Sequence, residues 1–312
     1  MTSNGFTRLV FYSNFFYIIC LLALLSQTCI VLEIPPAPTW LYLCLCCSTL
    51  LFYNHAYLSD KNTGDGSDER IRWYQENKIM ISSGQILLTW VFLTGSWLLK
   101  DALLSRIQQR PLLAYWPLWL FPLLALLYFG GIQPGKSPLN LRQFGWLKPI
   151  IIALVWSGTT LLLPAWWHEQ PLHIFYPNPP TLILFAQQTI FLFAISILFD
   201  IKDFESDHNQ QLKTWAIRIG PEQLLKKLIL PIAILGCLLE LLPGYWTVYP
   251  PMAGVLNCIP WVLLIFACQS LHRKTAVLHY LWMIDGLIPV KASIGIIAHL
   301  LTTGNNVEEN QC

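Results

Sequence analysis

The chain has 312 residues, of which 55% are hydrophobic and only 12% are charged, and its formal net charge is +2. Ordinary soluble domains carry roughly 25% charged residues, so this composition excludes a soluble globular protein and predicts a chain that crosses a membrane several times. The small net charge gives no reason to expect a nucleic-acid partner. Membrane lipids are the partners that we expect along the whole chain.

Apolar segments of roughly the 20 residues that a bilayer requires recur through the whole sequence. The first is followed by Glu33, Ile34 and two prolines with no small-residue cleavage pattern, so we interpret it as a retained span and not as a signal peptide. The series predicts one all-helical domain, residues 1–312. Its nine spans are expected at about residues 10–32, 39–57, 79–98, 112–131, 149–167, 181–199, 228–246, 252–271 and 279–301.

The basic residues orient these spans. With the N-terminus in the cytoplasm, fifteen of the nineteen lysines and arginines fall in cytoplasmic segments, three fall in outside loops and one, Lys291, lies within a span. Because cytoplasmic loops carry an excess of Lys and Arg, this distribution predicts a cytoplasmic N-terminus. The polar loops 58–78 and 200–223 then face the cytoplasm as well.

Three aspartates stand at the end of the sixth predicted span, in the sequence Asp200-Ile-Lys-Asp203-Phe-Glu-Ser-Asp207. On a helix, offsets of three and seven place Asp200, Asp203 and Asp207 on one face, where their charges repel unless a cation neutralises them. Ligands that offer only oxygen favour a hard ion, above all Mg²⁺, which commonly shares its coordination shell with substrate phosphates. The motif therefore predicts that these three aspartates bind magnesium and, through it, a diphosphate.

The stretch from Asp200 to Gly220 resembles the second aspartate-rich motif of the UbiA superfamily of intramembrane prenyltransferases. The shared pattern is DxxDxxxD, followed by Lys213-Thr214 and a closing Arg218-x-Gly220, in a loop between the sixth and seventh predicted spans. Nine spans with both motif loops on the cytoplasmic side are also the architecture of this superfamily. The resemblance covers nearly the whole chain in topology but only about twenty residues in motif.

The resemblance implies an active-site cavity between the helices that opens near the cytoplasmic face. In the family, Mg²⁺ ions bridge the aspartates to the diphosphate of an allylic isoprenoid, whose tail lies among the helices. The resemblance thus implies a magnesium-dependent prenyltransferase that acts on an isoprenoid diphosphate and an acceptor, aromatic or lipid-like, within the membrane. Two alternatives stay open: a UbiA-type membrane terpene cyclase, in which the substrate's own double bond attacks, and a non-catalytic protein that binds prenyl lipids.

The first aspartate-rich motif of the family, NDxxDxxxD, would begin at Asn54, and here the chain departs from the pattern. In that register the sequence has Asn54, His55, Leu58 and Asn62, so the asparagine remains and the three carboxylates are absent. We expect Asn54 to complete the catalytic site opposite Asp200. Four acidic residues follow and could substitute if the loop folds back over the cavity: Asp60, Asp65, Asp68 and Glu69.

Basic residues could bind the diphosphate directly, or could serve only as signals for membrane topology. Lys213 belongs to the second motif and is a stronger candidate for binding the diphosphate than the basic residues of the fourth loop, residues 128–148. That loop resembles the family's region in which a tyrosine and basic residues approach the diphosphate. The candidates after the first motif and in the fourth loop are Arg70, Arg72, Lys78, Lys136, Arg142 and Lys148.

Two charged residues lie inside the last predicted span, where a charge is costly and usually faces the interior of the bundle. Asp285 and Lys291 are six residues apart, so their side chains point in different directions around the helix axis. Asp285 lies near the cytoplasmic end. We expect it either to reach the substrate cavity, as a base, a ligand or the partner of an arginine, or to make a structural ion pair or hydrogen bond.

Overall fold

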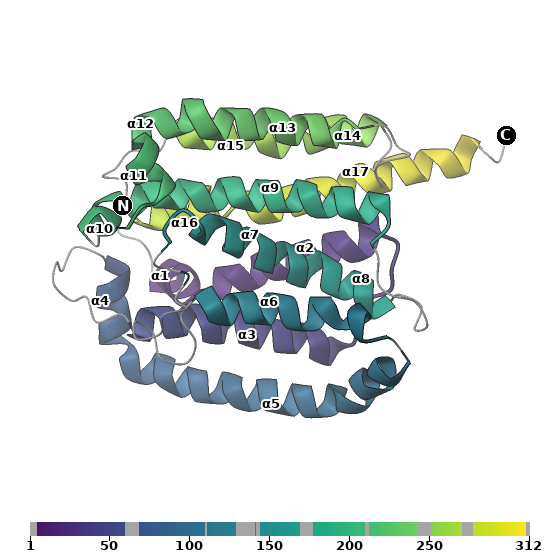
Figure 1. The fold of residues 1–312 in the computed structure, drawn as a ribbon, viewed down its shortest axis with the longest axis horizontal. Helices are drawn as coiled ribbons and strands as arrows, with labels where there is room; N and C mark the ends of the chain where they lie inside the picture. Colours follow the sequence, from purple (N-terminus) through teal and green to yellow (C-terminus); the bar gives the residue numbers. More distant parts are fainter. Residues whose placement is uncertain are drawn as a thin grey trace.

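The fold is a bundle of helices that run side by side, as Figure 1 shows. The structure is a computed structural model, and within the residues that it describes every regular element is a helix, as the composition predicts. The described residues are 5–59, 69–109, 111–128, 141, 144–168, 177–209, 212–242, 251–269 and 277–309.

The first half of the chain contains α1 to α8. A π-helical turn, Gly158–Leu162, joins α7 to α8, and a short 3₁₀ turn, Leu112–Tyr115, precedes α6. The bounds of these helices are α1 Gly5–Tyr12, α2 Phe15–Val31, α3 Thr39–Ser59, α4 Glu69–Glu76, α5 Lys78–Gln108, α6 Trp116–Tyr128, α7 Lys148–Ser157 and α8 Leu163–His168.

The second half contains α9 to α17. A second π-helical turn, Leu225–Ile229, joins α12 to α13. The bounds are α9 Pro179–Lys202, α10 Phe204–Asn209, α11 Trp215–Ile219, α12 Pro221–Leu224, α13 Leu230–Glu240, α14 Pro251–Asn257, α15 Ile259–Gln269, α16 Val277–Met283 and α17 Leu287–Glu309.

Six helical segments within the described residues are long and apolar enough to cross a membrane. They coincide with six of the nine predicted spans, which confirms a multi-pass α-helical membrane protein. A bent pair, α1 and α2, would make a seventh span, and the apolar helix Leu112–Tyr128 is shorter than the rest. The six are Thr39–Leu58, Lys78–Gln108, Lys148–His168, Pro179–Lys202, Met252–Gln269 and Val277–Thr302.

Two predicted spans are not the single straight helices that we expected. The segment 10–32 breaks at Asn14, which has a φ of 68°, so that α1 and α2 meet at an angle of 60°. The last span is interrupted between α16 and α17 at residues 284–286. A Cβ on Gly286 would lie 2.2 Å from the carbonyl oxygen of Trp282, so glycine permits this tight break.

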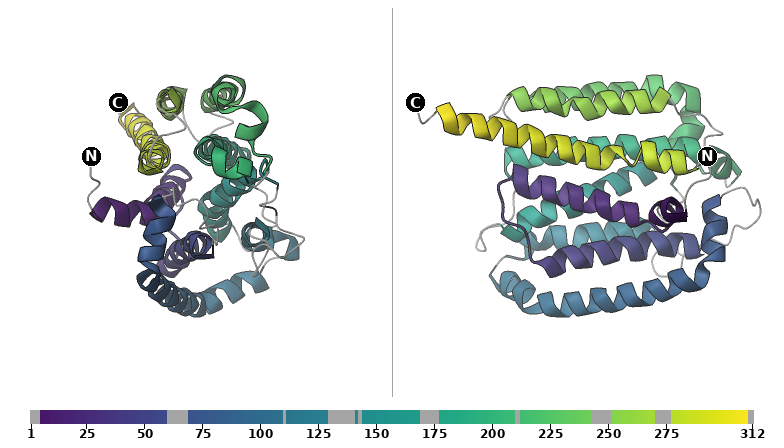
Figure 2. Two further views of the ribbon diagram at one scale, coloured as in Figure 1. Left: turned by 90° about the vertical axis from the view of Figure 1, so that its left-hand side faces the viewer. Right: turned by 180° about the vertical axis from the view of Figure 1, so that it is seen from behind.

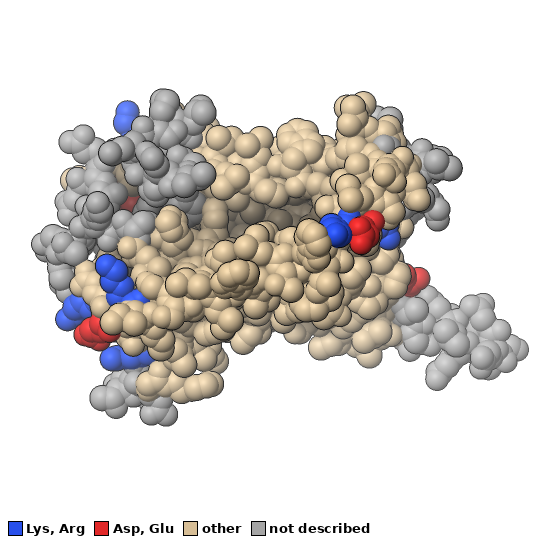
Figure 3. Space-filling view, turned by 90° about the horizontal axis from the view of Figure 1, so that it is seen from below, with Lys and Arg blue, Asp and Glu red and all other residues tan. Residues whose placement is uncertain are grey.

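The short helices α1, α4, α10, α11 and α16 gather at one end of the bundle, together with the N-terminus (Figure 1). The right-hand view of Figure 2, from behind, shows the N-terminus at this end and the end of α17 at the opposite end. On the face shown in Figure 3, charged side chains lie toward the two ends, and an uncharged band lies between them. The polar loops 58–78 and 200–223 are predicted to lie on the same side of the membrane. The helices that flank these two loops lie at the same end of the bundle.

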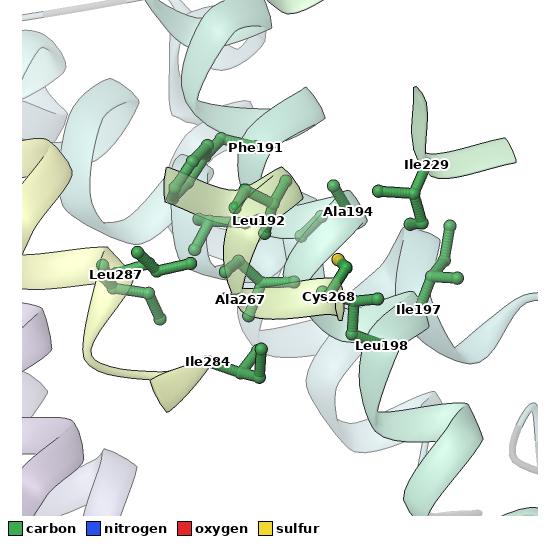
Figure 4. Packing of buried hydrophobic residues seen from close by; sticks show 14 of the residues in the cluster. Phe191, Leu192, Ala194, Ile197, Leu198, Ile229, Ala267, Cys268, Ile284 and Leu287 are labelled. Atoms are coloured by element: carbon green, nitrogen blue, oxygen red, sulfur yellow. The ribbon is translucent and has the colours of Figure 1, made fainter. Parts of the chain in front are cut away.

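The core of the second half forms around α9, which packs against α7 and α13. Asn178 begins this helix, because its side-chain oxygen accepts a hydrogen bond of 2.9 Å from the backbone N–H of Thr181 and prolines occupy the first helical positions. Buried residues of α9 such as Phe191 and Leu198 face α15 and the break between α16 and α17 (Figure 4). In the first half, α2 packs on α17, and α5 lies at the edge against α3.

Replacing Gly236 by alanine should destabilise the contact between α13 and α15. A Cβ at this position would lie 2.1 Å from the ring of Trp261, which is fully buried. Forcing such a ring to move costs about 1–3 kcal/mol. Gly84→Ala in α5 is the control, because nothing lies within 4 Å of its added Cβ and alanine favours a helix. Thermal unfolding in detergent should show a lower midpoint for Gly236→Ala alone; equal midpoints would contradict this packing.

Candidate functional site

The three aspartates of the second motif lie where α9 gives way to α10. Helical hydrogen bonding continues across this point, because the N–H of Asp203 bonds to Phe199 at 3.0 Å and that of Asp207 bonds to Asp203 at 2.8 Å. The offsets of three and seven therefore bring the side chains toward the same lysine, as the sequence pattern predicts. Asp200 is fully buried, Asp207 is buried and Asp203 is partly exposed.

Two lysines pair with two of these carboxylates, Asp200 and Asp203. Lys148, the first residue of α7, places its Nζ 3.3 Å from Asp203 Oδ2 and 3.8 Å from Asp200 Oδ1. Lys202 places its Nζ 2.6 Å from Asp203 Oδ1. Burial opposes the ionisation of Asp203, but Lys202 and Lys148 outweigh it and hold the pKa of this carboxyl well below its usual range. We call these three aspartates and two lysines the carboxylate cluster.

Asp200 is the least satisfied member of the carboxylate cluster. Its carboxylate interacts weakly with the backbone amide of Trp215, but neither oxygen makes a hydrogen bond of normal geometry within the described residues. A buried carboxylate is costly unless it is paired and hydrogen-bonded. The ion pair with Lys148 thus stabilises a group that has little other support.

A metal ion does not fit the carboxylate cluster as it is arranged. The part of the chain that the structure describes contains no group of three or more His, Cys, Asp or Glu side chains that could hold one. An ammonium group, that of Lys148, lies among the carboxylates instead. The magnesium ion expected from the motif stays a prediction.

The opposite side of the site, at the predicted first motif, is a buried network of hydrogen bonds. Asn54 Oδ1 accepts from Asn14 Nδ2 and from the Tyr74 hydroxyl, both at 2.7 Å. Asn14 Nδ2 also donates to the Tyr74 hydroxyl at 2.8 Å, and Arg70 donates to Asn14 Oδ1. We call Asn14, Asn54, Arg70 and Tyr74 the amide network. It contains no carboxylate, so this side differs in charge from the carboxylate cluster.

Arg70 also holds the end of α1. Its Nε and Nη2 each donate to the carbonyl of Tyr12 at 3.3 Å, and Nη2 approaches the carbonyl of Phe11 at 3.4 Å. Its Nη1 donates to the Tyr57 hydroxyl at 2.9 Å, and the guanidinium carbon lies 4.2 Å from the centroid of that ring. A cation that satisfies the last carbonyls of a helix is a C-terminal cap. Its predicted role in binding diphosphate stays a prediction.

Asp285 interacts with charged residues of both the carboxylate cluster and the amide network, and a group of aromatic residues lies near it. Asp285, buried in the break between α16 and α17, interacts electrostatically with Tyr17, Arg70 and Lys202. The ring of Tyr17 lies 4.5 Å from that of Tyr53, whose hydroxyl accepts a bond of 2.9 Å from Trp156 Nε1. Asp285 is thus the residue that is influenced by charges from both sides.

The remaining predicted residues lie outside this arrangement. Lys213, Arg72 and Lys78 are exposed at the surface. Glu69 accepts a bond of 3.0 Å from the Tyr12 hydroxyl and so belongs with the end of α1. Five candidates lie outside the described residues: Lys136, Arg142, Asp60, Asp65 and Asp68.

Sequence reasoning missed the aromatic residues and Asn14. Tyr17, Tyr53 and Trp156 occur within apolar segments that are rich in aromatic side chains, so nothing in the pattern separates them from residues that only pack. Asn14 is the one polar amide near the start of the first apolar segment, and that position was an available signal. Lys148 was named among the candidates, but not as the partner of the aspartates.

The fold and the site define a multi-pass α-helical membrane protein with a buried ionisable site near one end of its bundle. Comparisons with family models, curated proteins and solved structures found no significant match.

Proposed function

We propose that this chain is a divergent UbiA-type protein that binds an isoprenoid diphosphate near one end of the bundle and transfers the isoprenoid to an acceptor in the membrane. The observation that carries the proposal is the convergence of two distant motifs. Asp285 interacts electrostatically with Lys202, in the carboxylate cluster, and with Arg70, in the amide network. These interactions support the proposal that Asp200 and Asn54 lie on two sides of one substrate site.

The proposed topology has nine crossings, with the N-terminus and both motif loops in the cytoplasm and a substrate cavity between the helices. Six long apolar helices and the bent pair support most of these crossings. The excess of basic residues in the loops on one side supports the orientation. The shorter helix Leu112–Tyr128 and the segment from Pro221 to Glu240 would supply the remaining two.

The proposed chemistry uses groups that the site already holds. Lys148 and Lys202 can exchange part of their contact with the aspartates for contact with a diphosphate, which is a stronger acceptor. The bond between the allylic carbon and the diphosphate oxygen then breaks, and the diphosphate leaves with the electron pair. The aromatic rings of Tyr17, Tyr53 and Trp156 are suited to face the carbocation. The acceptor forms the new bond to carbon and loses a proton, for which Asp285 is the nearby base candidate.

A second candidate function is binding of an isoprenoid diphosphate without catalysis. The amide network favours it, because Asn54 is already committed to Asn14 and Tyr74 and this network contains no carboxylate. A protein of this kind would hold the diphosphate through lysines but would not ionise the substrate. The membrane terpene cyclase is distinguished from a transferase by its products, which form without an acceptor.

Diphosphate release tests the proposal. The purified protein in nanodiscs is supplied with Mg²⁺ and with geranyl, farnesyl or geranylgeranyl diphosphate, and binding and release are measured together. Asp200→Asn should reduce release by roughly 100-fold or more, the scale for removal of one preorganised group that stabilises a transition state. Asp101→Asn, an exposed aspartate in α5, is the matched control and should leave release unchanged.

The outcomes separate the candidate functions. Release by the wild type that Asp200→Asn abolishes supports an ionising enzyme. Binding without release favours the non-catalytic protein. Neither binding nor release with any of the three diphosphates would contradict the proposal.

A further inference from the structure

Lys148 lies at the centre of the carboxylate cluster although it comes from a distant part of the chain. It is 55 residues away from Asp203 in sequence, and its Nζ lies within 4 Å of both Asp203 and Asp200. Asp207 also acts on it electrostatically. A single ammonium group therefore contacts two carboxylates of the motif and lies within the electrostatic reach of the third.

The negative charges of the carboxylate cluster require a cation at the position that the Lys148 ammonium group occupies. Asp200 is fully buried, and its two oxygens make no hydrogen bond of normal geometry within the described residues. Lys202 contacts Asp203 on Oδ1, whereas Lys148 contacts it on Oδ2 and reaches toward Asp200. Removal of the Lys148 ammonium would leave the buried Asp200 carboxyl either charged without its nearest cation or protonated, and both states are unfavourable for an ionised site.

The spacing around Lys148 suits an ammonium group and not a metal ion. Mg²⁺ needs oxygens at about 2.0–2.1 Å in a nearly octahedral shell. The Asp203 and Asp200 oxygens lie 3.3 and 3.8 Å from Nζ. These carboxylates would have to move closer before an ion could replace the ammonium group, and Lys148 would have to withdraw.

We propose that the Lys148 ammonium takes the place of a divalent cation in the carboxylate cluster, so that the cluster does not bind a divalent metal by itself. The Lys148 side chain is then the cation of the site, and a diphosphate that binds there contacts Lys148 before it contacts any metal ion. This inference concerns the same site as the proposed function, but it rests on the contacts of Lys148 and needs no isoprenoid substrate.

Mn²⁺ binding tests the inference without any diphosphate. Mn²⁺ prefers the same oxygen ligands as Mg²⁺, and its free and bound forms differ in electron paramagnetic resonance. The wild type in nanodiscs should bind no Mn²⁺ at the cluster. Lys148→Met, which removes the charge and keeps an unbranched side chain, should bind Mn²⁺ at least about tenfold more tightly than any residual binding that the wild type shows. Lys148→Arg keeps the charge and should show no gain.

Two controls locate the effect. Lys213→Met removes an exposed lysine of the same motif and should leave Mn²⁺ binding unchanged. Adding Asp203→Asn to Lys148→Met should abolish the gain, because one of the required carboxylates is lost. Lys148→Gln provides a second neutral variant if Lys148→Met does not fold.

The inference is overturned if the wild type binds Mn²⁺ tightly and Asp203→Asn removes that binding. It is also overturned if folded Lys148→Met or Lys148→Gln binds no more Mn²⁺ than the wild type. Neither result depends on isoprenoid binding, so a failure here is distinct from a failure of the proposed function.

Discussion

Replacing Glu240 by leucine is expected to lower the free energy of unfolding by about 3–5 kcal/mol, the usual effect of breaking a buried ion pair by removing one partner. Glu240 on α13 and Lys291 on α17 are 2% and 5% exposed, and their Oε1 and Nζ atoms lie 3.7 Å apart. Lys291 Nζ also lies 5.7 Å from the centroid of the Phe191 ring. Without Glu240, the ammonium group would remain charged in apolar surroundings.

Lys291→Leu should have a similar effect, whereas the double replacement of Glu240 and Lys291 by leucine should recover most of the loss. A buried pair can often be exchanged for apolar residues at little cost, because both desolvation penalties disappear together. Glu222→Leu, at an exposed position on α12, should change stability by no more than about 0.5 kcal/mol. Reversible unfolding in mixed micelles measures all four variants. Equal losses for Glu240→Leu and Glu222→Leu would show that the pair does not join α13 to α17.

Replacing Arg70 by methionine is expected to destabilise the protein by about 3 kcal/mol or more. Arg70 is 3% exposed and donates to two carbonyls at the end of α1, to Asn14 and to the Tyr57 hydroxyl. Hydrogen bonds to a charged group contribute roughly 1.5–3 kcal/mol each, and buried acceptors that lose their donor add a further cost. Loss of Arg70 should therefore free α1 and loosen the amide network.

Arg72→Met is the matched control, because Arg72 lies two residues away on the same helix and is exposed. Hydrogen exchange should become faster in α1 for Arg70→Met only. Arg70→Lys should fall between the wild type and Arg70→Met, since an ammonium group cannot reach all of the acceptors that the guanidinium fork contacts. If Arg70→Met and Arg72→Met exchange at the same rate in α1, Arg70 does not cap this helix.

The parts of the fold that could be predicted are those determined by local composition. Long apolar segments predicted the six spanning helices, and the spacing of Asp200, Asp203 and Asp207 predicted that their side chains share a side. The two breaks could not be predicted in the same way. Asn14 lies within an apolar segment with no proline beside it, and the break at Gly286 depends on the carbonyl of Trp282 in the preceding turn.

The partners of the site residues depend on contacts between distant segments. The sequence identified Lys148 and Arg70 as cations near the motifs, but it could not show that one pairs with Asp203 and that the other caps α1. Both residues had been considered for binding diphosphate. Which cation contacts a carboxylate and which contacts a carbonyl is determined by packing, and a single sequence carries no local signal for that choice.

The most direct test of diphosphate binding near this end of the bundle is photo-crosslinking with mass-spectrometric mapping. A geranylgeranyl-length diphosphate analogue, with its photoreactive group next to the diphosphate, is bound to the protein in nanodiscs and activated. We expect crosslinks in the peptides that contain Lys148 and Asp200–Asn209, and we expect inorganic pyrophosphate to suppress them. Crosslinks spread along the exposed face of α5 and unaffected by pyrophosphate would show that the analogue behaves as a lipid, and would contradict a diphosphate site at the carboxylate cluster.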